Sequence, residues 1–214
     1  MTLLARGAII VRVGAARAAL PPEQQHAIDA LWHAANASAT LHDGRIVSVV
    51  SWSAMPAGVE ISAETVPYRW WVAQRHGHPD LGVRPLAVCG ITLDADGRVL
   101  IGRRSGGFDH ARRWELVPSG GCELQADGTV NPLADARREL AEESGLAAGT
   151  AEPVGLMEDP TVGIFEALVL LRVRDGGTPI AGPEHDSLLF VERRELMRYD
   201  PIPPAAEAAA ILLK

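Results

Sequence analysis

The spacing of apolar residues predicts one helix and several strands in the first part of the chain. Apolar positions recur at helical spacing over residues 21–39, where two prolines stand at the start and their missing N–H groups are harmless. Short apolar runs predict a buried strand at 8–13, a strand at 45–50 and the beginning of another at 58–61. The aromatic segment 68–75 fits either a helix or a strand.

After a boundary at 82–85 the pattern changes to regular strands separated by turns. The first two of these strands flank a turn of Asp and Gly residues and are predicted to form a hairpin. A final helix is predicted at 205–213. The strands are predicted at 86–92, 98–103, 114–117, 153–157, 163–173 and 188–191. Strands mixed with two or three helices indicate an α/β or α+β sandwich. We therefore divide the chain into an N-terminal extension, 1–85, and a larger domain, 86–214.

The composition narrows the class of protein. The 214 residues carry a formal net charge of −7, which argues against binding of nucleic acid polymers or anionic membranes through the overall field. A run of about 18 apolar residues is lacking, so no membrane-spanning helix is predicted. The two cysteines, Cys89 and Cys122, cannot form a disulfide framework, and they favour a reducing, cytoplasmic setting. Lys214 is the only lysine, which nearly excludes lysine-dependent chemistry.

A helix over 132–144 is predicted from signals at both of its ends. Asn131 is a favourable N-cap residue, and Pro132 suits the first helical position. Gly145 is the residue expected just past the C-terminus of a helix. These signals are independent of any chemistry that the helix carries.

Three glutamates share one face of this helix. At about 100° per residue, Glu139, Glu142 and Glu143 fall within one arc of about 100°. Ionised carboxylates this close repel one another unless a cation lies against them, and hard divalent cations such as Mg²⁺ prefer oxygen ligands. The alternative is a solvated acidic face on a surface helix. Leu133 and Leu140 border the arc, and this apolar edge favours a position at the boundary of the core.

The segment 138–146, RELAEESGL, resembles the second half of the Nudix box, G-x5-E-x7-R-E-U-x-E-E-x-G-U, in which U is a bulky apolar residue. The segment 114–121, WELVPSGG, is similar to the strand and Gly-Gly pair that enter the loop before the catalytic helix in that family. The order of strand, Gly-rich loop, helix and further strands is also the order found in that family.

The first half of the box departs from the family pattern. Val130 stands where the family usually has Glu, and the loop 122–131 is about three residues longer than usual. The missing Glu normally orients the arginine of the box, which is Arg138 here. Glu123 or Asp127, both in the longer loop, could take its place.

The resemblance implies an α/β fold, a Nudix-type α/β/α sandwich with a mixed sheet, preceded here by a small α+β N-terminal extension. It also implies a metal site with Mg²⁺ or Mn²⁺ as the cofactor. The implied ligands are Glu139, Glu142, Glu143 and the backbone carbonyl of Gly120.

A catalytic base is implied as well. In the family it is one of the helix glutamates, for which Glu139 and Glu142 are the candidates, or an acid on a later loop. Among the later acids we favour Glu184, just before the last predicted strand, over Glu158 and Asp159.

The implied activity is metal-dependent hydrolysis of a diphosphate linkage in a small-molecule nucleotide. A weaker resemblance, in the segments 41–44, 68–69, 81–86, 102–105 and 114–121, points to a subgroup with an N-terminal extension that cleaves UDP-glucose and UDP-galactose. A nucleoside diphosphate sugar is therefore the favoured substrate. The alternatives are ADP-ribose, dinucleotides, nucleoside triphosphates whether oxidised or not, a non-catalytic nucleotide-binding module and an isomerase of the same fold. A homodimer is left open.

Five residues are candidates for contact with the substrate. Arg103 and Arg104 close a strand, and guanidinium groups suit phosphate. Trp114 could stack on a base, with a place in the core as the alternative. Tyr68 and Arg69 are the candidates if the extension forms one wall of the cleft, since ligand sites favour domain interfaces. The alternative for the extension is a purely structural or dimer-forming lobe.

Overall fold

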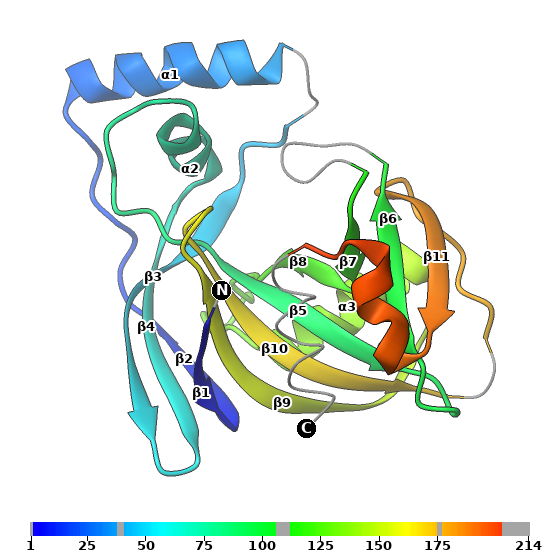
Figure 1. Ribbon diagram of the computed structural model, residues 1–214. Coiled ribbons are helices and arrows are strands. Elements are labelled where there is room, and N and C mark those ends of the chain that lie inside the picture. The colour runs from blue at the N-terminus through cyan, green and yellow to red at the C-terminus, as the bar shows by residue number, and fades with distance from the viewer. Residues whose placement is uncertain (1, 38–40, 106–111, 175–176, 203–214) are drawn as a thin grey trace.

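The computed structural model describes residues 2–37, 41–105, 112–174 and 177–202. Its strands form a large sheet and a smaller sheet beside it (Figure 1). The helix predicted at 205–213 lies outside the described residues. The helical elements are α1 (Pro22–Asn36), α2 (Tyr68–Arg75), α3 (Pro132–Ser144) and the 3-10 helix η1 (Arg193–Tyr199).

The large sheet has eight strands in the order β1-β9-β10-β5-β6-β11, with β7 paired to β6 and β8 paired to β5. Strands β5 and β10 are parallel, whereas β9 runs antiparallel to both β1 and β10. The sheet is therefore mixed, as predicted. Its strands are β1 (Thr2–Arg6), β5 (Leu86–Leu93), β6 (Val99–Arg104), β7 (Trp114–Leu116), β8 (Ser119–Gly121), β9 (Ala148–Asp159), β10 (Ile164–Val173) and β11 (His185–Val191).

The smaller sheet has the order β2-β4-β3 and consists of β2 (Ala8–Val13), β3 (Arg45–Met55) and β4 (Gly58–Pro67). Strand β2 is parallel to β4, and β3 is antiparallel to β4. The strand predicted at 8–13 is confirmed with the same bounds, but the prediction that it is buried is wrong. Because β2 lies at the edge of its sheet, alternate side chains face outward, and Ile10 is 41% exposed.

The aromatic segment 68–75 forms the helix α2. Trp70 and Trp71 are buried in a cluster with Ile28 and Trp32 of α1. Four consecutive side chains of α2 are buried, so this helix is covered on more than one side. The apolar residues of this segment are therefore consecutive, without the alternation of a strand or the single stripe of a surface helix. This spacing explains why the sequence fits either structure.

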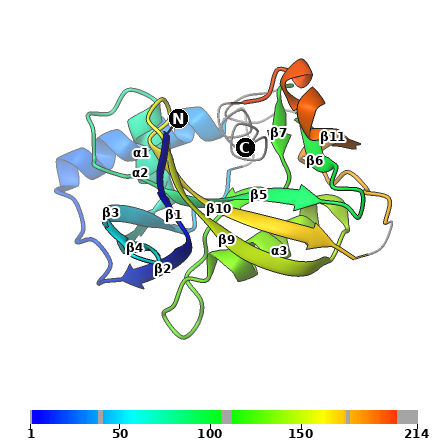
Figure 2. The same ribbon diagram turned by 60° about the horizontal axis from the view of Figure 1, so that its bottom comes forward.

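Helix α3 covers one face of the large sheet (Figure 2). Ala136 and Leu140 are fully buried in one apolar cluster with Leu86 and Val88 of β5. On the opposite face, Leu196 of η1 packs in a second cluster against other residues of the sheet. The central sheet thus separates the layer of α3 from that of η1.

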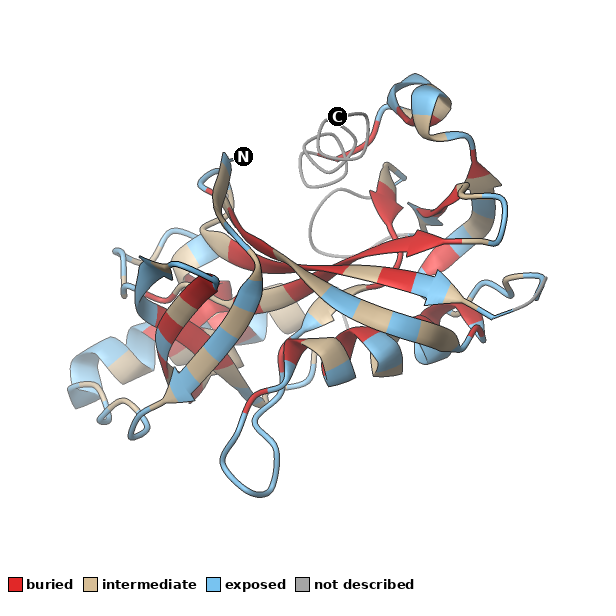
Figure 3. Ribbon diagram, turned by 90° about the horizontal axis from the view of Figure 1, so that it is seen from below, coloured by how far each residue is buried: buried red, intermediate tan, exposed pale blue. Residues whose placement is uncertain are grey.

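The N-terminal extension is part of the same packed body. Val49 and Ile61 of the smaller sheet belong to the apolar cluster beneath α3, and β1 pairs with β9 of the large sheet. Buried residues are continuous where the two sheets meet (Figure 3). The expectation that the extension packs firmly on the rest of the chain is confirmed. In the described ranges, no helix is long and apolar enough to cross a membrane.

Candidate active site

Helix α3 begins and ends where the sequence predicts. The Asn131 side chain accepts a hydrogen bond from the Ala134 N–H at 3.2 Å. Gly145 adopts the left-handed conformation with φ 69°, and its N–H bonds the Ala141 carbonyl. Both ends are therefore fixed by local interactions, and the buried Leu140 sets which face of the helix meets the sheet.

Glu139 lies directly against Gly120 of β8. A Cβ added at Gly120 would overlap the Glu139 carboxyl group, so only glycine permits this close approach. Strand β8 pairs with β5, which places Gly120 next to Val88 beneath the helix. The structure thus brings together two of the predicted metal ligands. Burial raises the pKa of the Glu139 carboxyl, against the opposing effect of Arg138.

Glu143 is the most buried of the three helix glutamates, with 5% of the residue exposed. Its Oε1 accepts a hydrogen bond from the Ser119 N–H at 3.2 Å, while Oε2 is buried without a hydrogen-bond partner in the described structure. Burial raises its pKa to about 9, and the negative charges of Glu115, Glu184 and Glu139 act in the same direction. A buried carboxyl among like charges needs either a proton or a cation.

Arg138 is the positive charge that contacts the acidic cluster. Its guanidinium lies 2.8 Å from a Glu139 oxygen, 3.0 Å from Glu142 and 3.3 Å from Glu123. The prediction that Glu123 or Asp127 approaches this arginine is confirmed for Glu123. Asp127 instead accepts hydrogen bonds from Thr129 within its own turn.

Glu142 points outward from this cluster. Its side chain is 59% exposed and is paired with Arg138. Among the described residues, no three acidic, histidine or cysteine side chains converge as a ready-made metal site. The predicted set of Glu139, Glu142 and Glu143 is thus on one helix, but only Glu139 and Glu143 face the β8 strand in this arrangement.

Glu184 comes to the same end of α3 from the loop before β11. Its charge raises the pKa of both Glu139 and Glu143, and the side chain is exposed. The less favoured Asp159 is buried and accepts hydrogen bonds from Thr161 in the turn after β9. Glu158 precedes it in the same strand and lines a surface pocket together with Arg84, a residue of the N-terminal extension.

The predicted phosphate-binding arginines have different surroundings. Arg104 is held by the buried Glu115, with Nη1 2.9 and 2.8 Å from the two carboxylate oxygens. This ion pair engages Nη1 of the guanidinium, and binding of phosphate by Arg104 stays a prediction. Arg103 is exposed, and its Nε donates to the Arg112 carbonyl at 3.4 Å.

Trp114 packs on the face of the sheet opposite α3. Its ring meets Tyr199 edge to face, with centroids 5.3 Å apart, in the cluster that contains Leu196. Its carbonyl accepts a hydrogen bond from the Ile202 N–H at 2.8 Å. The alternative of a place in the core therefore describes Trp114 better than stacking on a base.

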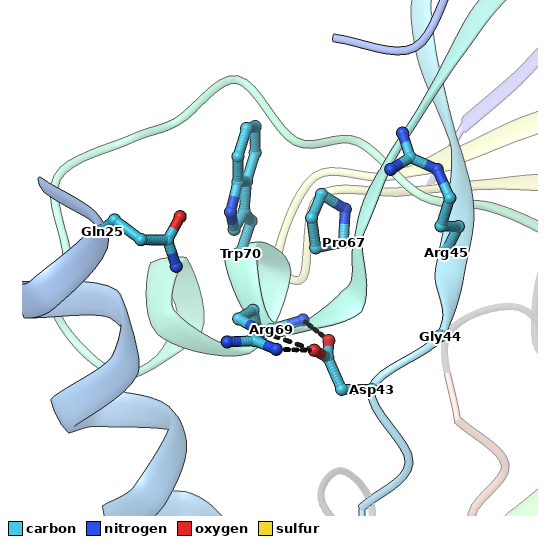
Figure 4. Close-up of a pocket in the computed structure, with 7 residues that line it drawn as sticks. All are labelled: Gln25, Asp43, Gly44, Arg45, Pro67, Arg69 and Trp70. Carbon is cyan, nitrogen blue, oxygen red and sulfur yellow. Dashed lines mark hydrogen bonds and ion pairs between the residues drawn. The ribbon is translucent and has the colours of Figure 1, made fainter. Parts of the chain in front are cut away.

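Tyr68 and Arg69 serve to join helices within the extension. Arg69 pairs with Asp43 and lies 2.9 Å from Asp29 of α1, and it lines a surface pocket with Trp70 (Figure 4). The Tyr68 ring meets Trp32 at a centroid distance of 6.2 Å. The contacts of α2 are with α1 and β4, on the side of the molecule away from α3. The structure does not bring these two residues to the glutamates of α3.

Two buried residues beside this site escaped the sequence reasoning. Glu115 is 2% exposed, and the Nε2 atom of His185 lies 2.9 Å from its Oε1. Glu115 stands between apolar residues of a short strand, a position where an acid is unusual. That position was the one available signal, whereas nothing in the sequence links it to His185.

Comparisons with known proteins agree with this architecture. The sequence model of the NUDIX domain matches residues 83–212. The chain is 28% identical over 127 residues to the CTP pyrophosphohydrolase of Escherichia coli K12, which covers 58% of this chain and 87% of that protein. The crystal structure of DR0079 from Deinococcus radiodurans is similar with a TM-score of 0.52 at 18% identity, and covers 80% of this chain and all of that one. An ADP-ribose pyrophosphatase from Streptococcus suis has a TM-score of 0.44 at 20% identity, over 61% of this chain and 90% of its own.

Proposed function

The chain belongs to the NUDIX family of hydrolases, and we propose that its substrate is a nucleoside diphosphate derivative, with a nucleotide sugar as the first choice. As a member of this family it hydrolyses diphosphate bonds in nucleotide derivatives. The observation that carries the proposed site is the approach of Glu139 to Gly120 and of Glu143 to the Ser119 N–H, which places two carboxylates of α3 against β8. Acidic groups gathered in this way repel a phosphate, so a cation is needed to bind one.

The residues of this site suit a hard divalent cation. All of the donors are oxygen atoms, Glu143 Oε2 is buried without a hydrogen-bond partner in the described structure, and Gly120 leaves room for the Glu139 carboxyl. We propose that Glu139, Glu143 and the Gly120 carbonyl hold Mg²⁺ or Mn²⁺, and that Glu142 joins them by leaving Arg138. When bound, such a cation neutralises phosphate charge and lowers the pKa of bound water.

We propose Glu184 as the group that takes the proton from the attacking water. The water oxygen forms a bond to one phosphorus atom, the bridging P–O bond breaks, and the second phosphate leaves with the bond electrons. Glu184 is exposed, so it is accessible to water, and its loop is bonded to the end of α3 through the Gly182 N–H and the Glu143 carbonyl. A carboxylate can act as a general base when one of its oxygen atoms is within hydrogen-bond distance of the attacking water.

A nucleoside triphosphate is the second candidate substrate. It is favoured by the relative named a CTP pyrophosphohydrolase, which this chain matches over most of that protein's length. The nucleotide sugar is favoured by the extension, whose sheet shares an apolar cluster with the residues beneath α3. Both candidates offer the same diphosphate unit to the glutamates, and they differ in the group at its far end.

The two thiols support a reducing compartment, and we propose the cytoplasm. Cys89 and Cys122 are buried and free, and burial raises the pKa of both thiols. A raised pKa keeps a thiol protonated and unreactive. Neither cysteine is therefore assigned a chemical role.

The test is a phosphate-release screen with Mg²⁺ or Mn²⁺ over UDP-glucose, UDP-galactose, ADP-ribose, a dinucleotide and CTP. The first four are treated with phosphatase after reaction, and CTP is treated with inorganic pyrophosphatase, because phosphatase would remove phosphate from CTP itself. The expected result is metal-dependent release that is strongest for a nucleotide sugar and lost on addition of EDTA. Glu143→Gln should lower turnover by roughly 100-fold or more, because this residue is the buried member of the site. Turnover of CTP alone would replace the first candidate by the second. Full turnover in EDTA would refute the metal site.

A further inference from the structure

A cluster of two buried polar side chains and one half-buried arginine lies next to the proposed site. It joins Arg104 of β6, Glu115 of β7 and His185 of β11, and each comes from a different strand. The side chains of His185 and Glu115 are 0% and 2% exposed. Arg104 Nη1 donates to both Glu115 oxygens, and His185 Nε2 donates to Oε1 at 2.9 Å. None of these three residues is among the proposed metal ligands.

The ring of His185 fits this place because Gly102 has no side chain. A Cβ at Gly102 would overlap the imidazole ring and meet Val117 as well. The ring is thus fixed by packing on one side and by the Glu115 carboxylate on the other. Burying His185 and Glu115 carries a desolvation penalty, which the hydrogen bonds of Glu115 to Arg104 and His185 offset.

Glu184, the proposed proton acceptor, comes directly before His185 in the chain. Consecutive Cα atoms lie about 3.8 Å apart, so fixing His185 restricts where the Glu184 backbone can be. The Ser105 N–H donates to the Glu184 carbonyl at 2.9 Å, and the Ser105 hydroxyl donates to the Pro183 carbonyl at 2.9 Å. Ser105 therefore holds the backbone of both Pro183 and Glu184.

The same loop is also bonded to the end of α3. The Gly182 N–H donates to the Glu143 carbonyl at 3.0 Å, and the Ile180 N–H donates to the Ser144 carbonyl at 2.9 Å. These carbonyls are among those that a helix leaves without partners at its C-terminus. The loop thus ties the position of Glu184 to the helix that carries Glu139 and Glu143.

We propose that His185, held by the Glu115–Arg104 ion pair, is a positioning residue that fixes Glu184 at the water-activating end of the site. This inference rests on the proposed function, since it requires Glu184 to be the proton acceptor. The Glu184 side chain is exposed, so its own packing does little to place it. A misplacement of about 1 Å at such a group reduces turnover on the order of 100-fold.

The experiment compares His185→Leu and His185→Gln in the wild-type and Glu184→Gln backgrounds, with the substrate found in the screen. His185→Leu should lower kcat by roughly 30- to 100-fold with little change in KM. His185→Gln retains a donor for Glu115 and should recover most of that loss. In the Glu184→Gln background, His185→Leu should cost less than about threefold, because the two residues act through the same step.

An equal loss from His185→Leu in both backgrounds would overturn the inference, because it would reveal a structural effect independent of Glu184. Gly102→Ala provides a second variant, since it displaces the ring without removing any polar group, and the same pattern is expected. Melting curves and Mn²⁺ titrations of each variant separate misfolding from mispositioning. If Glu184→Gln turns over at the wild-type rate, the proposed base and this inference both fail. If only the His185 and Gly102 variants are fully active, this inference alone fails.

Discussion

Replacing the most buried helix glutamate should stabilise the metal-free protein near neutral pH. The pKa of Glu143 rises from 4.5 to about 9 in the fold, chiefly because of burial. The folded state therefore binds the proton more tightly than the unfolded state does. This contribution to stability is fully present below about pH 4.5 and is lost as the pH rises toward 9. Glu143→Gln removes the titration and keeps an oxygen for the Ser119 N–H.

The size of the effect follows from the pKa difference. Each pH unit above the unfolded pKa lowers the free energy of unfolding by up to about 1.4 kcal/mol. Between pH 4.5 and neutral pH the difference between wild type and Glu143→Gln grows to roughly 3 kcal/mol. Relaxation of the site reduces this number, so the slope against pH is a better observable than the absolute value.

Urea unfolding in EDTA at several pH values from about 5 to 8 measures this slope. A stability difference between wild type and Glu143→Gln that does not change with pH would refute the reasoning. Adding Mn²⁺ should reverse the order, because a ligand that binds only the folded protein stabilises the wild type by mass action. Glu166→Gln is the matched control, since burial raises the pKa of Glu166 to about 8.

Glu166 makes a suitable control because it faces away from α3. Its neighbours in β10, Phe165 and Ala167, belong to the cluster beneath that helix, and side chains alternate along a strand. Glu166→Gln should therefore show a similar gain with pH in EDTA, while its response to Mn²⁺ stays like that of the wild type. Loss of the Mn²⁺ response in both variants would show that the effect is not local to the proposed site.

Three further predictions follow from single contacts. Asn131→Ala removes the N-cap of α3 and should lower the free energy of unfolding by about 1 kcal/mol in urea titrations. Gly120→Ala places a methyl group against Glu139 and should weaken Mn²⁺ binding in calorimetry, with circular dichroism unchanged. Arg69→Ala breaks partly exposed ion pairs with Asp43 and Asp29, so it should lower the melting temperature by a few degrees and leave turnover of a nucleotide sugar and of a minimal diphosphate unchanged.

Local signals in the sequence were enough to predict helix α3. Asn131 and Gly145 mark its ends, and both interactions depend on residues within a few positions of one another. The approach of Glu139 to Gly120 was predicted from the family resemblance. It depends on a backbone without a side chain at 120, which a sequence shows directly.

Interactions between distant strands could not be predicted in this way. Arg104 was predicted to bind phosphate, but it meets Glu115 across the β6–β7 pair, and His185 joins them from much later in the chain. Strand β1 was missed because its partner is β9, which is far away in sequence. Trp114 faces η1, which was not predicted either. In each case the side chain's surroundings are set by the strand order, and no local pattern contains that order.

Val130 replaces the usual glutamate in the first half of the Nudix box, and Glu123 supplies the carboxylate instead. Val130 is only 8% exposed and packs in the cluster with Ala136 and Leu140, so a glutamate at this position would have to be buried. The longer loop instead brings Glu123 to 3.3 Å from Arg138. The arginine therefore keeps a carboxylate partner outside the helix while its other contacts are to Glu139 and Glu142. In the proposed metal site Glu142 leaves Arg138, and the contact with Glu123 would then still hold the arginine.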